Sequence, residues 1–375
     1  MGDKNPKSKK NMNSLTIGNL TAKLPVVQGG MGIGISMSGL ASAVANEGGI
    51  GVIATACVGM SEPDLNKNYL EANMRALKSE IRKARGMTRG ILGVNIMVAL
   101  TNFSDMVKVS VEEGIDIIFA GAGLPLNLPR YLNDKATTKL VPIVSSGRAA
   151  ALIAKRWIEK FNYTPDAFVV EGPKAGGHLG FKPEQINDEQ FSLDRLLSQV
   201  LEALKPIAQK VNKKISVIAG GGVYTGADIH RLIEIGASGV QMATRFVTTV
   251  ECDASDAFKN TYIQSRKEDI KIIKSPVGMP GRVIGNQFVK DIEDGKKKPF
   301  NCPYHCIVTC KMKESPYCIA LALINARKGR MTHGFAFAGE NAYRTDKIIS
   351  VKELVQNLKD EYSKGSVNTG SGNLI

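Results

Sequence analysis

The stretch 215–251, ISVIAGGGVYTGADIHRLIEIGASGVQMATRFVTTVE, predicts a strand, a glycine turn, a helix, a second strand and another turn. Residues 215–219 form a short apolar run typical of a strand buried on both faces. Glycines 220–222 follow the first strand, and Ala243 and Thr244 follow the second. Turns of small residues at the carboxyl ends of neighbouring parallel strands expose backbone N–H groups that can hold a phosphate. Ordinary α/β scaffolding is the alternative, but two such turns on consecutive strands favour a phosphate site.

Eight short apolar segments alternate with helical segments, which is the pattern of parallel βαβ units. The predicted strands are 24–28, 51–55, 91–97, 115–120, 140–144, 167–170, 215–219 and 239–242. Because most of them end in glycine, we expect an α/β fold closed into a (β/α)8 TIM barrel. An open doubly wound sheet is the alternative. Gly30-x-Gly32-x-Gly34 resembles a dinucleotide fingerprint only loosely, and no acidic ribose partner follows the second strand, so no standard dinucleotide site is predicted.

The 375 residues divide into four predicted parts. Residues 1–14 are a disordered basic tail, 15–270 form the barrel, 271–362 form a partly helical C-terminal extension with a cysteine-rich segment, and 363–375 are a loose tail. Within the extension, residues 276–282 are expected to be an irregular loop and 351–362 an amphipathic helix. A helix over residues 256–267 is expected just before the extension.

Charge and hydropathy limit the expected location of the protein and the partners it can bind. The sequence contains no apolar run of the length of a membrane span and no secretory signal at its N-terminus. We therefore expect no membrane partner, a cytoplasmic location and reduced cysteines. The formal net charge of +14 could attract nucleic acid, an acidic carrier protein or phosphorylated ligands. No nucleic-acid motif accompanies it, so we expect a solvated basic surface and no nucleic-acid partner.

His178 is the main candidate for chemistry among the four histidines. It follows the sixth predicted strand through Gly176-Gly177, at the end of a barrel where active sites lie. Its imidazole is suited to proton transfer at neutral pH, and a structural loop histidine is the alternative. Asn95 lies near the end of the third strand, where its amide could bond a flat heteroaromatic ring or simply anchor a loop.

The cysteine-rich segment carries Cys302, Cys306, Cys310 and Cys318. Four thiols this close could bind zinc or an iron–sulfur cluster, although the spacing matches neither the zinc-ribbon nor the common ferredoxin pattern. Cysteines four residues apart also share one face of a helix, where they can simply pack. The role of the segment therefore stays open between a metal site and packing.

Six motifs, taken together and in this order, resemble the FMN-dependent nitronate monooxygenases, once called 2-nitropropane dioxygenases. They are LPVVQGGMG, GVNIMV, FAGAGLP, EGPKAGGHLG, VIAGGGVYTG and QMATRFVTTVE, and the resemblance covers roughly residues 15 to 290. The family shares its barrel with the flavin-type enoyl-acyl-carrier-protein reductases.

The resemblance implies FMN as cofactor and assigns residues to it. The phosphate would bind at Gly221, Gly222, Ala243 and Thr244. The ring would lie against Gly29, Gly30 and Met31 with Asn95 at its edge, and Ala175, Gly176 and Gly177 would line the same pocket. His178 matches the family's active-site histidine.

The implied activity is oxidation of an alkyl nitronate with oxygen. The alternative is an NAD(P)H-dependent enoyl reductase of fatty-acid synthesis, which would add NAD(P)H as co-substrate and an acyl carrier protein as partner. A non-catalytic flavin-binding protein and a phosphorylated-sugar enzyme are further options. Self-association into a homo-oligomer is left open.

Overall fold

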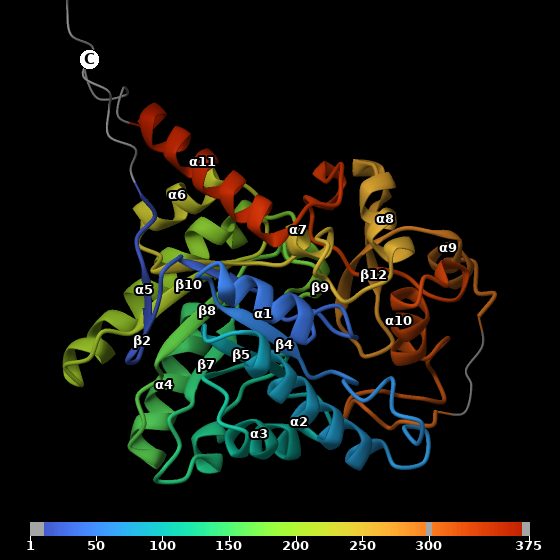
Figure 1. Ribbon diagram of the computed structural model, residues 1–375, viewed down its shortest axis with the longest axis horizontal. Coiled ribbons are helices and arrows are strands. Elements are labelled where there is room, and N and C mark those ends of the chain that lie inside the picture. The colour runs from blue at the N-terminus through green and yellow to red at the C-terminus, as the bar shows by residue number, and fades with distance from the viewer. Residues whose placement is uncertain (1–10, 298–301, 370–375) are drawn as a thin grey trace, which may run out of the picture.

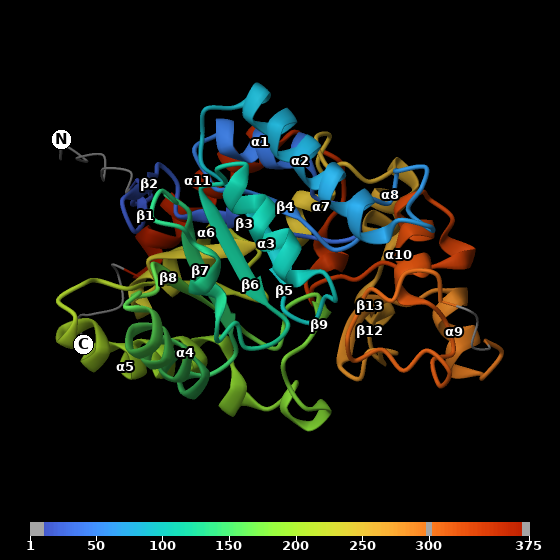
Figure 2. The same cartoon turned by 90° about the horizontal axis from the view of Figure 1, so that it is seen from below.

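A closed barrel of eight parallel strands forms the centre of the protein (Figures 1 and 2). The computed structural model describes residues 11–297 and 302–369. Hydrogen-bonded neighbours follow the order β3 (Val26–Gln28), β11 (Gly239–Met242), β10 (Ser216–Gly220), β8 (Ala167–Glu171), β7 (Lys139–Val144), β6 (Ile117–Gly121), β5 (Leu92–Met97) and β4 (Gly51–Ala54). A parallel bridge between Val27 and Ile50 joins the two ends of this order. The predicted TIM barrel is therefore confirmed, and the open sheet is excluded.

An outer layer of helices covers the barrel. It comprises α1 (Ser38–Asn46), α2 (Tyr69–Met87), α3 (Phe103–Glu112), α4 (Gly147–Phe161), α5 (Leu193–Lys210) and α6 (Gly226–Ile235). After β11 there is only the short helix α7 (Thr244–Val247), and the place beside α6 is taken by the last helix, α11 (Val351–Thr369) (Figure 1). The two backbones pack so closely that a Cβ on Gly226 would lie 2.2 Å from the Leu358 carbonyl oxygen. The chain thus leaves the barrel after β11 and returns to complete its wall.

The ends of the chain differ in how far they are described. Residues 1–10 of the predicted basic tail and residues 370–375 of the predicted loose tail lie outside the described part. Helix α11 continues to Thr369, beyond the predicted end of the amphipathic helix at residue 362. Within the described part, none of the helices combines the length and the apolar character needed to cross a bilayer.

The inside of the barrel is apolar at its base and polar at its top. The hairpin of β1 (Leu15–Ile17) and β2 (Leu20–Ala22) covers the base, where Leu15 and Ile17 pack with inward-facing residues such as Phe119, Val169 and Ile218. Side chains in a strand alternate between its two faces. Near the carboxyl ends of β5, β8 and β11, inward positions belong to Asn95, Glu171 and Gln241. These three residues form a polar floor above the apolar core.

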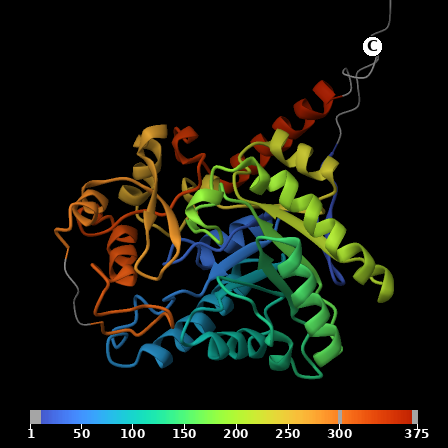
Figure 3. The ribbon, with the colours of Figure 1, turned by 180° about the vertical axis from the view of Figure 1, so that it is seen from behind.

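The C-terminal extension lies to one side of the strand ends (Figures 2 and 3). Helix α8 (Asp256–Gln264) leads into it, and it includes β12 (Ile270–Lys274), β13 (Pro280–Ile284), α9 (Gln287–Glu293) and α10 (Ile319–Arg327). The helix predicted to reach residue 267 ends at Gln264, and the second half of the predicted irregular loop is β13. The reason is tertiary: β13 pairs with β12 and also with β9 (Gly177–His178), about a hundred residues earlier in the chain. Sequence periodicity cannot show such a partner.

Candidate functional site

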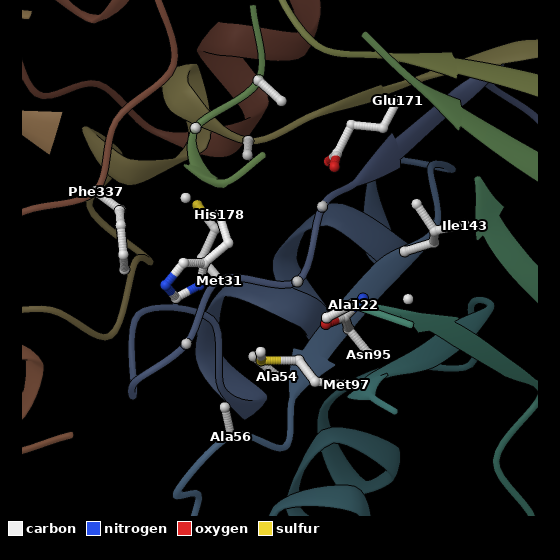
Figure 4. A pocket seen from close by; sticks show the side chains of 18 of the residues that line it. Met31, Ala54, Ala56, Asn95, Met97, Ala122, Ile143, Glu171, His178 and Phe337 are labelled. Atoms are coloured by element: carbon white, nitrogen blue, oxygen red, sulfur yellow. The ribbon is translucent and has the colours of Figure 1, made fainter. Parts of the chain in front are cut away.

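A cavity of about 420 Å³ lies at the carboxyl ends of the barrel strands, between the strand ends and the extension (Figure 4). Such a position is where TIM barrels carry their active sites. The structure brings all of the residues predicted for the site to the wall of this cavity. They are Gly29, Gly30, Met31, Asn95, Ala175, Gly176, Gly177, His178, Gly221, Gly222, Ala243 and Thr244.

The glycine turn after β10 has the backbone conformation that its sequence suggests. Gly221 has φ +97° and Gly222 has φ +91°, a region that favours glycine. A Cβ on Gly221 would lie 2.6 Å from the Gly172 carbonyl oxygen. Outside the sheet ladder, the N–H groups of Gly221 and Gly222 donate to no acceptor among the described residues, so they are available to an anion. The nearby N-terminus of α6 is already capped by Thr225, whose Oγ1 accepts from the Asp228 N–H, while the Asp228 carboxylate accepts from the N–H groups of Tyr224 and Thr225.

A segment of the extension completes this turn. Asn341 Nδ2 donates to the Gly222 carbonyl oxygen at 2.8 Å, and the Gly339 N–H donates to Thr244 Oγ1 at 3.2 Å. Residues 339–341 also line the cavity. The small-residue turns after β10 and β11 are therefore tied to each other through a part of the chain about 100 residues away.

The polar floor offers hydrogen-bonding groups that the protein leaves unused. Within residues 11–297 and 302–369, the side chains of Asn95, Glu171 and Gln241 make no hydrogen bond or ion pair, and all three line the cavity. Figure 4 shows the Asn95 and Glu171 side chains extending into it. Burial raises the pKa of Glu171 to about 7. Two amides, a carboxyl group and the free N–H groups of the glycine turn suit a ring with polar edges that carries a phosphate tail, so the residues present fit a flavin nucleotide.

His178 reaches the cavity from the side of the extension. Its Nε2 lies 2.7 Å from Ser275 Oγ, and its ring meets the Phe337 ring edge-to-face at 4.9 Å. Pairing of β9 with β13, and the Leu179 N–H bond to the Pro280 carbonyl oxygen at 2.8 Å, fix the backbone. Burial lowers the pKa of His178 to about 4, so the imidazole is neutral at pH 7.

Arg282 holds the loop that leads to His178. Its buried guanidinium donates to the carbonyl oxygens of Pro173 and Ala175, the latter at 2.7 Å. It also lies 3.8 Å from the carboxylate of Glu340, which Lys174 approaches at 3.6 Å. The glycine-rich loop, which has one internal bond from the Ala175 N–H to the Gly172 carbonyl oxygen at 3.2 Å, is thus also fixed from the extension.

The four cysteines of the cysteine-rich segment do not lie together in one cluster. Cys302, Cys306 and Cys318 pack in an apolar cluster with Cys57, whereas Cys310 belongs to a different cluster. All six cysteines are free thiols, and no three His, Cys, Asp or Glu side chains in the described part are arranged to hold a metal ion. Burial raises the pKa of Cys57 to about 12, so this cavity-lining thiol is protonated.

Several cavity residues escaped the sequence analysis. Glu171 and Gln241 could have been found, because each occupies an inward position at the end of a predicted strand. Phe337 and Asn341 carry no comparable signal, since they reach the cavity only through the fold of the extension. The same holds for Ser275, which does not line the cavity but bonds to His178.

Comparison with known proteins gives consistent matches along the chain. A family model described as nitronate monooxygenase matches residues 13–361. A (3aS,4S,5R,7aS)-5-hydroxy-7a-methyl-1-oxo-octahydro-1H-indene-4-carboxyl-CoA dehydrogenase of Mycobacterium tuberculosis is 29% identical over 73% of this chain. The match spans 66% of that relative, just under two thirds of its length. A probable nitronate monooxygenase of Staphylococcus aureus is 27% identical over 73% of this chain and 78% of its own length.

A solved structure extends the likeness to the whole fold. FabK from Thermotoga maritima is 26% identical, with a TM-score of 0.71 over 94% of this chain and 96% of its own. The match therefore includes the extension as well as the barrel.

Proposed function

This chain belongs to the nitronate monooxygenase family, whose members are flavin-dependent oxidoreductases, and from that premise we propose that it uses FMN to oxidise alkyl nitronates with oxygen. The observation that carries the proposal is the pairing of two features across one cavity. One is a pair of small-residue turns, the first of which offers N–H groups to an anion, and the other is a neutral imidazole held over a polar floor.

The barrel wall would hold the cofactor. Gly221, Gly222, Ala243 and Thr244 would bind its phosphate, for which the free N–H groups of the first turn are suited. The ring would lie against the backbone of Gly29–Met31. Asn95 is packed against that backbone, because a Cβ on Gly30 would come within 2.3 Å of the Asn95 Cβ. When bound, the flavin supplies the electron transfer that no side chain of the protein can perform.

His178 would act on the substrate. A nitronate is an anion, and a neutral imidazole beside it can bind the nitro group or exchange the substrate proton. Burial lowers the pKa of His178, whereas a bound anion would raise that pKa by favouring the charged ring. The histidine is therefore able to respond to an anionic ligand without a permanent charge in the empty cavity.

An NAD(P)H-dependent enoyl-acyl-carrier-protein reductase is the second candidate function. It is favoured by the likeness to FabK and by the apolar part of the cavity wall under the extension. That part includes Leu100, Ile307, Ile319 and Leu323, which would accept an acyl chain. The net charge of +14 would also attract an acidic carrier protein.

Anaerobic reduction of the yellow protein separates the two functions. We expect the flavin absorbance near about 450 nm to bleach with an alkyl nitronate and to persist with NADH or NADPH. Bleaching by a pyridine nucleotide alone would reject the monooxygenase in favour of the reductase. The cofactor released by heat should have the mass of FMN, and a mass equal to FAD would contradict the proposed phosphate site.

A further inference from the structure

Ser275 is the only described residue that bonds to the His178 ring nitrogens. It is 2% exposed and lies at the end of β12, where the hairpin to β13 begins. Its Oγ lies 2.7 Å from His178 Nε2 and also accepts a hydrogen bond from the Val277 N–H at 3.4 Å. The geometry alone leaves open which of the two, serine or histidine, donates along the shorter contact.

The environment of the serine hydroxyl decides this question. A hydroxyl carries one hydrogen, and in the described part of the chain no acceptor other than His178 Nε2 lies within reach of Ser275 Oγ. If Nε2 carried the proton, the buried Ser275 hydrogen would have no acceptor, which costs about 1–3 kcal/mol. Nε2 is therefore the acceptor, and the ring proton of the neutral imidazole lies on Nδ1.

The other ring nitrogen is available to a ligand. His178 Nδ1 makes no bond within residues 11–297 and 302–369, and it is not among the polar atoms occluded from solvent. Because His178 lines the cavity, the Nδ1–H group is presented as a hydrogen-bond donor. A lone pair on this nitrogen, which a general base needs, is absent in this tautomer.

We propose that Ser275 is a positioning residue that fixes His178 as the Nδ1–H tautomer, so that the histidine donates a hydrogen bond to an anionic oxygen of the substrate instead of removing a proton from it. The inference rests on the proposed function for the identity of that oxygen, a nitro oxygen of the nitronate. The tautomer itself does not depend on any substrate. In many histidine sites the bond made by one ring nitrogen likewise sets the state of the other.

The tautomer can be measured directly in the protein without substrate. Two-bond ¹H–¹⁵N correlation spectra of protein labelled at histidine nitrogens distinguish a protonated Nδ1 from a protonated Nε2. The signal of His178 is identified by its loss in His178→Gln. We expect protonated Nδ1 and bare Nε2 at pH 7, and the opposite pattern would overturn the proposal whatever reaction the protein catalyses.

Variants of the serine test its role in turnover. Ser275→Ala should give a mixture of tautomers and lower kcat by about tenfold, with little change in KM. Ser275→Thr, which keeps the hydroxyl, should restore both the single tautomer and the wild-type kcat. Ser265→Ala is the matched control, since Ser265 is also buried but its hydroxyl bonds only to the Tyr262 carbonyl oxygen. An unchanged His178 spectrum and unchanged kcat in folded Ser275→Ala would reject the positioning role.

A failure of the proposed function would look different. If Nδ1 is protonated and Ser275→Ala changes the spectrum, but no nitronate is turned over, the tautomer stands and the substrate assignment falls.

Discussion

The two walls of the cavity are built in different ways. The barrel wall consists of short turns, each directly after its own strand, as Gly221 and Gly222 follow β10. The opposite wall consists of single side chains from distant parts of the extension, such as Phe337, which contacts His178. Ser275, also from the extension, supports this wall through its bond to His178. His178 itself belongs to the β8 loop but lies in a sheet with β12 and β13.

This difference separates two tasks. The barrel wall offers backbone N–H groups and a polar floor, which suit binding of a cofactor shared by a whole family. The extension wall sets the orientation and protonation of one imidazole, which suits control of the reaction. A change in the first wall should therefore remove the cofactor, and a change in the second should alter turnover while the cofactor stays bound.

Gly222→Asp is expected to have the largest effect. A carboxylate at this turn would repel the cofactor phosphate, and its Cβ would lie 2.8 Å from the Lys174 Cβ. We expect flavin retention to weaken by at least about a thousandfold, roughly 4 kcal/mol, as measured by absorbance of the purified protein. Gly222→Ala adds a Cβ without a charge, so it separates the effect of bulk from the effect of charge. Gly114→Asp, at another positive φ with open space around it, should keep its flavin. Full flavin content in Gly222→Asp would refute the placement of the phosphate.

The barrel wall could be predicted from the sequence because its signals are local. A buried strand followed by glycines, as in residues 215–222, indicates both the fold and the end of the barrel that carries the site. Arrangements such as Ser275 against His178, or Asn341 against Gly222, join positions about 100 residues apart. No periodicity or motif encodes them, and residues 276–282, which contain the first part of β13, are expected from the sequence to be an irregular loop because the remote pairing partner β9 leaves no local signal.

Arg282→Met should have the next largest effect, and on stability. Loss of the guanidinium leaves the buried carbonyl oxygens of Pro173 and Ala175 without donors. We expect the free energy of unfolding to fall by about 3 kcal/mol, measured by urea unfolding. Arg75→Met is the control, since Arg75 pairs with Glu62 and Asp64 at the surface and should contribute less than about 1 kcal/mol. Equal losses in both variants would show that the extension does not hold the His178 loop.

His178→Ala tests whether the two walls of the cavity act independently. The variant should lose about a hundredfold in kcat/KM for an alkyl nitronate, which is the order of loss when one hydrogen-bond donor to an anionic oxygen is removed. Its flavin content should equal that of the wild type, because the phosphate turns are untouched. His230→Ala provides a comparison, as His230 is buried under α11 against Tyr362 and away from the cavity. Loss of flavin in His178→Ala would mean that the two walls are not independent.

The smallest effect concerns two titratable groups that face each other across the cavity. Burial raises the pKa of Glu171 from 4.5 to about 7, so the stability it contributes is present below pH 4.5 and is lost as the pH rises toward and past 7. Burial lowers the pKa of His178 from 6.5 to about 4, so its contribution is present above pH 6.5 and is lost as the pH falls toward 4. The two slopes oppose each other between pH 4.5 and 6.5, and above 6.5 only that of Glu171 remains.

Glu171→Gln should therefore gain stability relative to the wild type as the pH rises from 5 to 8, in flavin-free protein followed by urea unfolding. We expect about 1–2 kcal/mol, less than the full pKa shift implies, because the carboxyl group borders a cavity that water can enter. Exposed Glu184→Gln should show no such trend. A flat difference between Glu171→Gln and the wild type would mean that the Glu171 carboxyl group is as well solvated in the cavity as in the unfolded chain. The floor of the barrel wall would then be open to water rather than shielded by the extension above it, and the neutral state of His178 would need a cause other than shared burial under that cover.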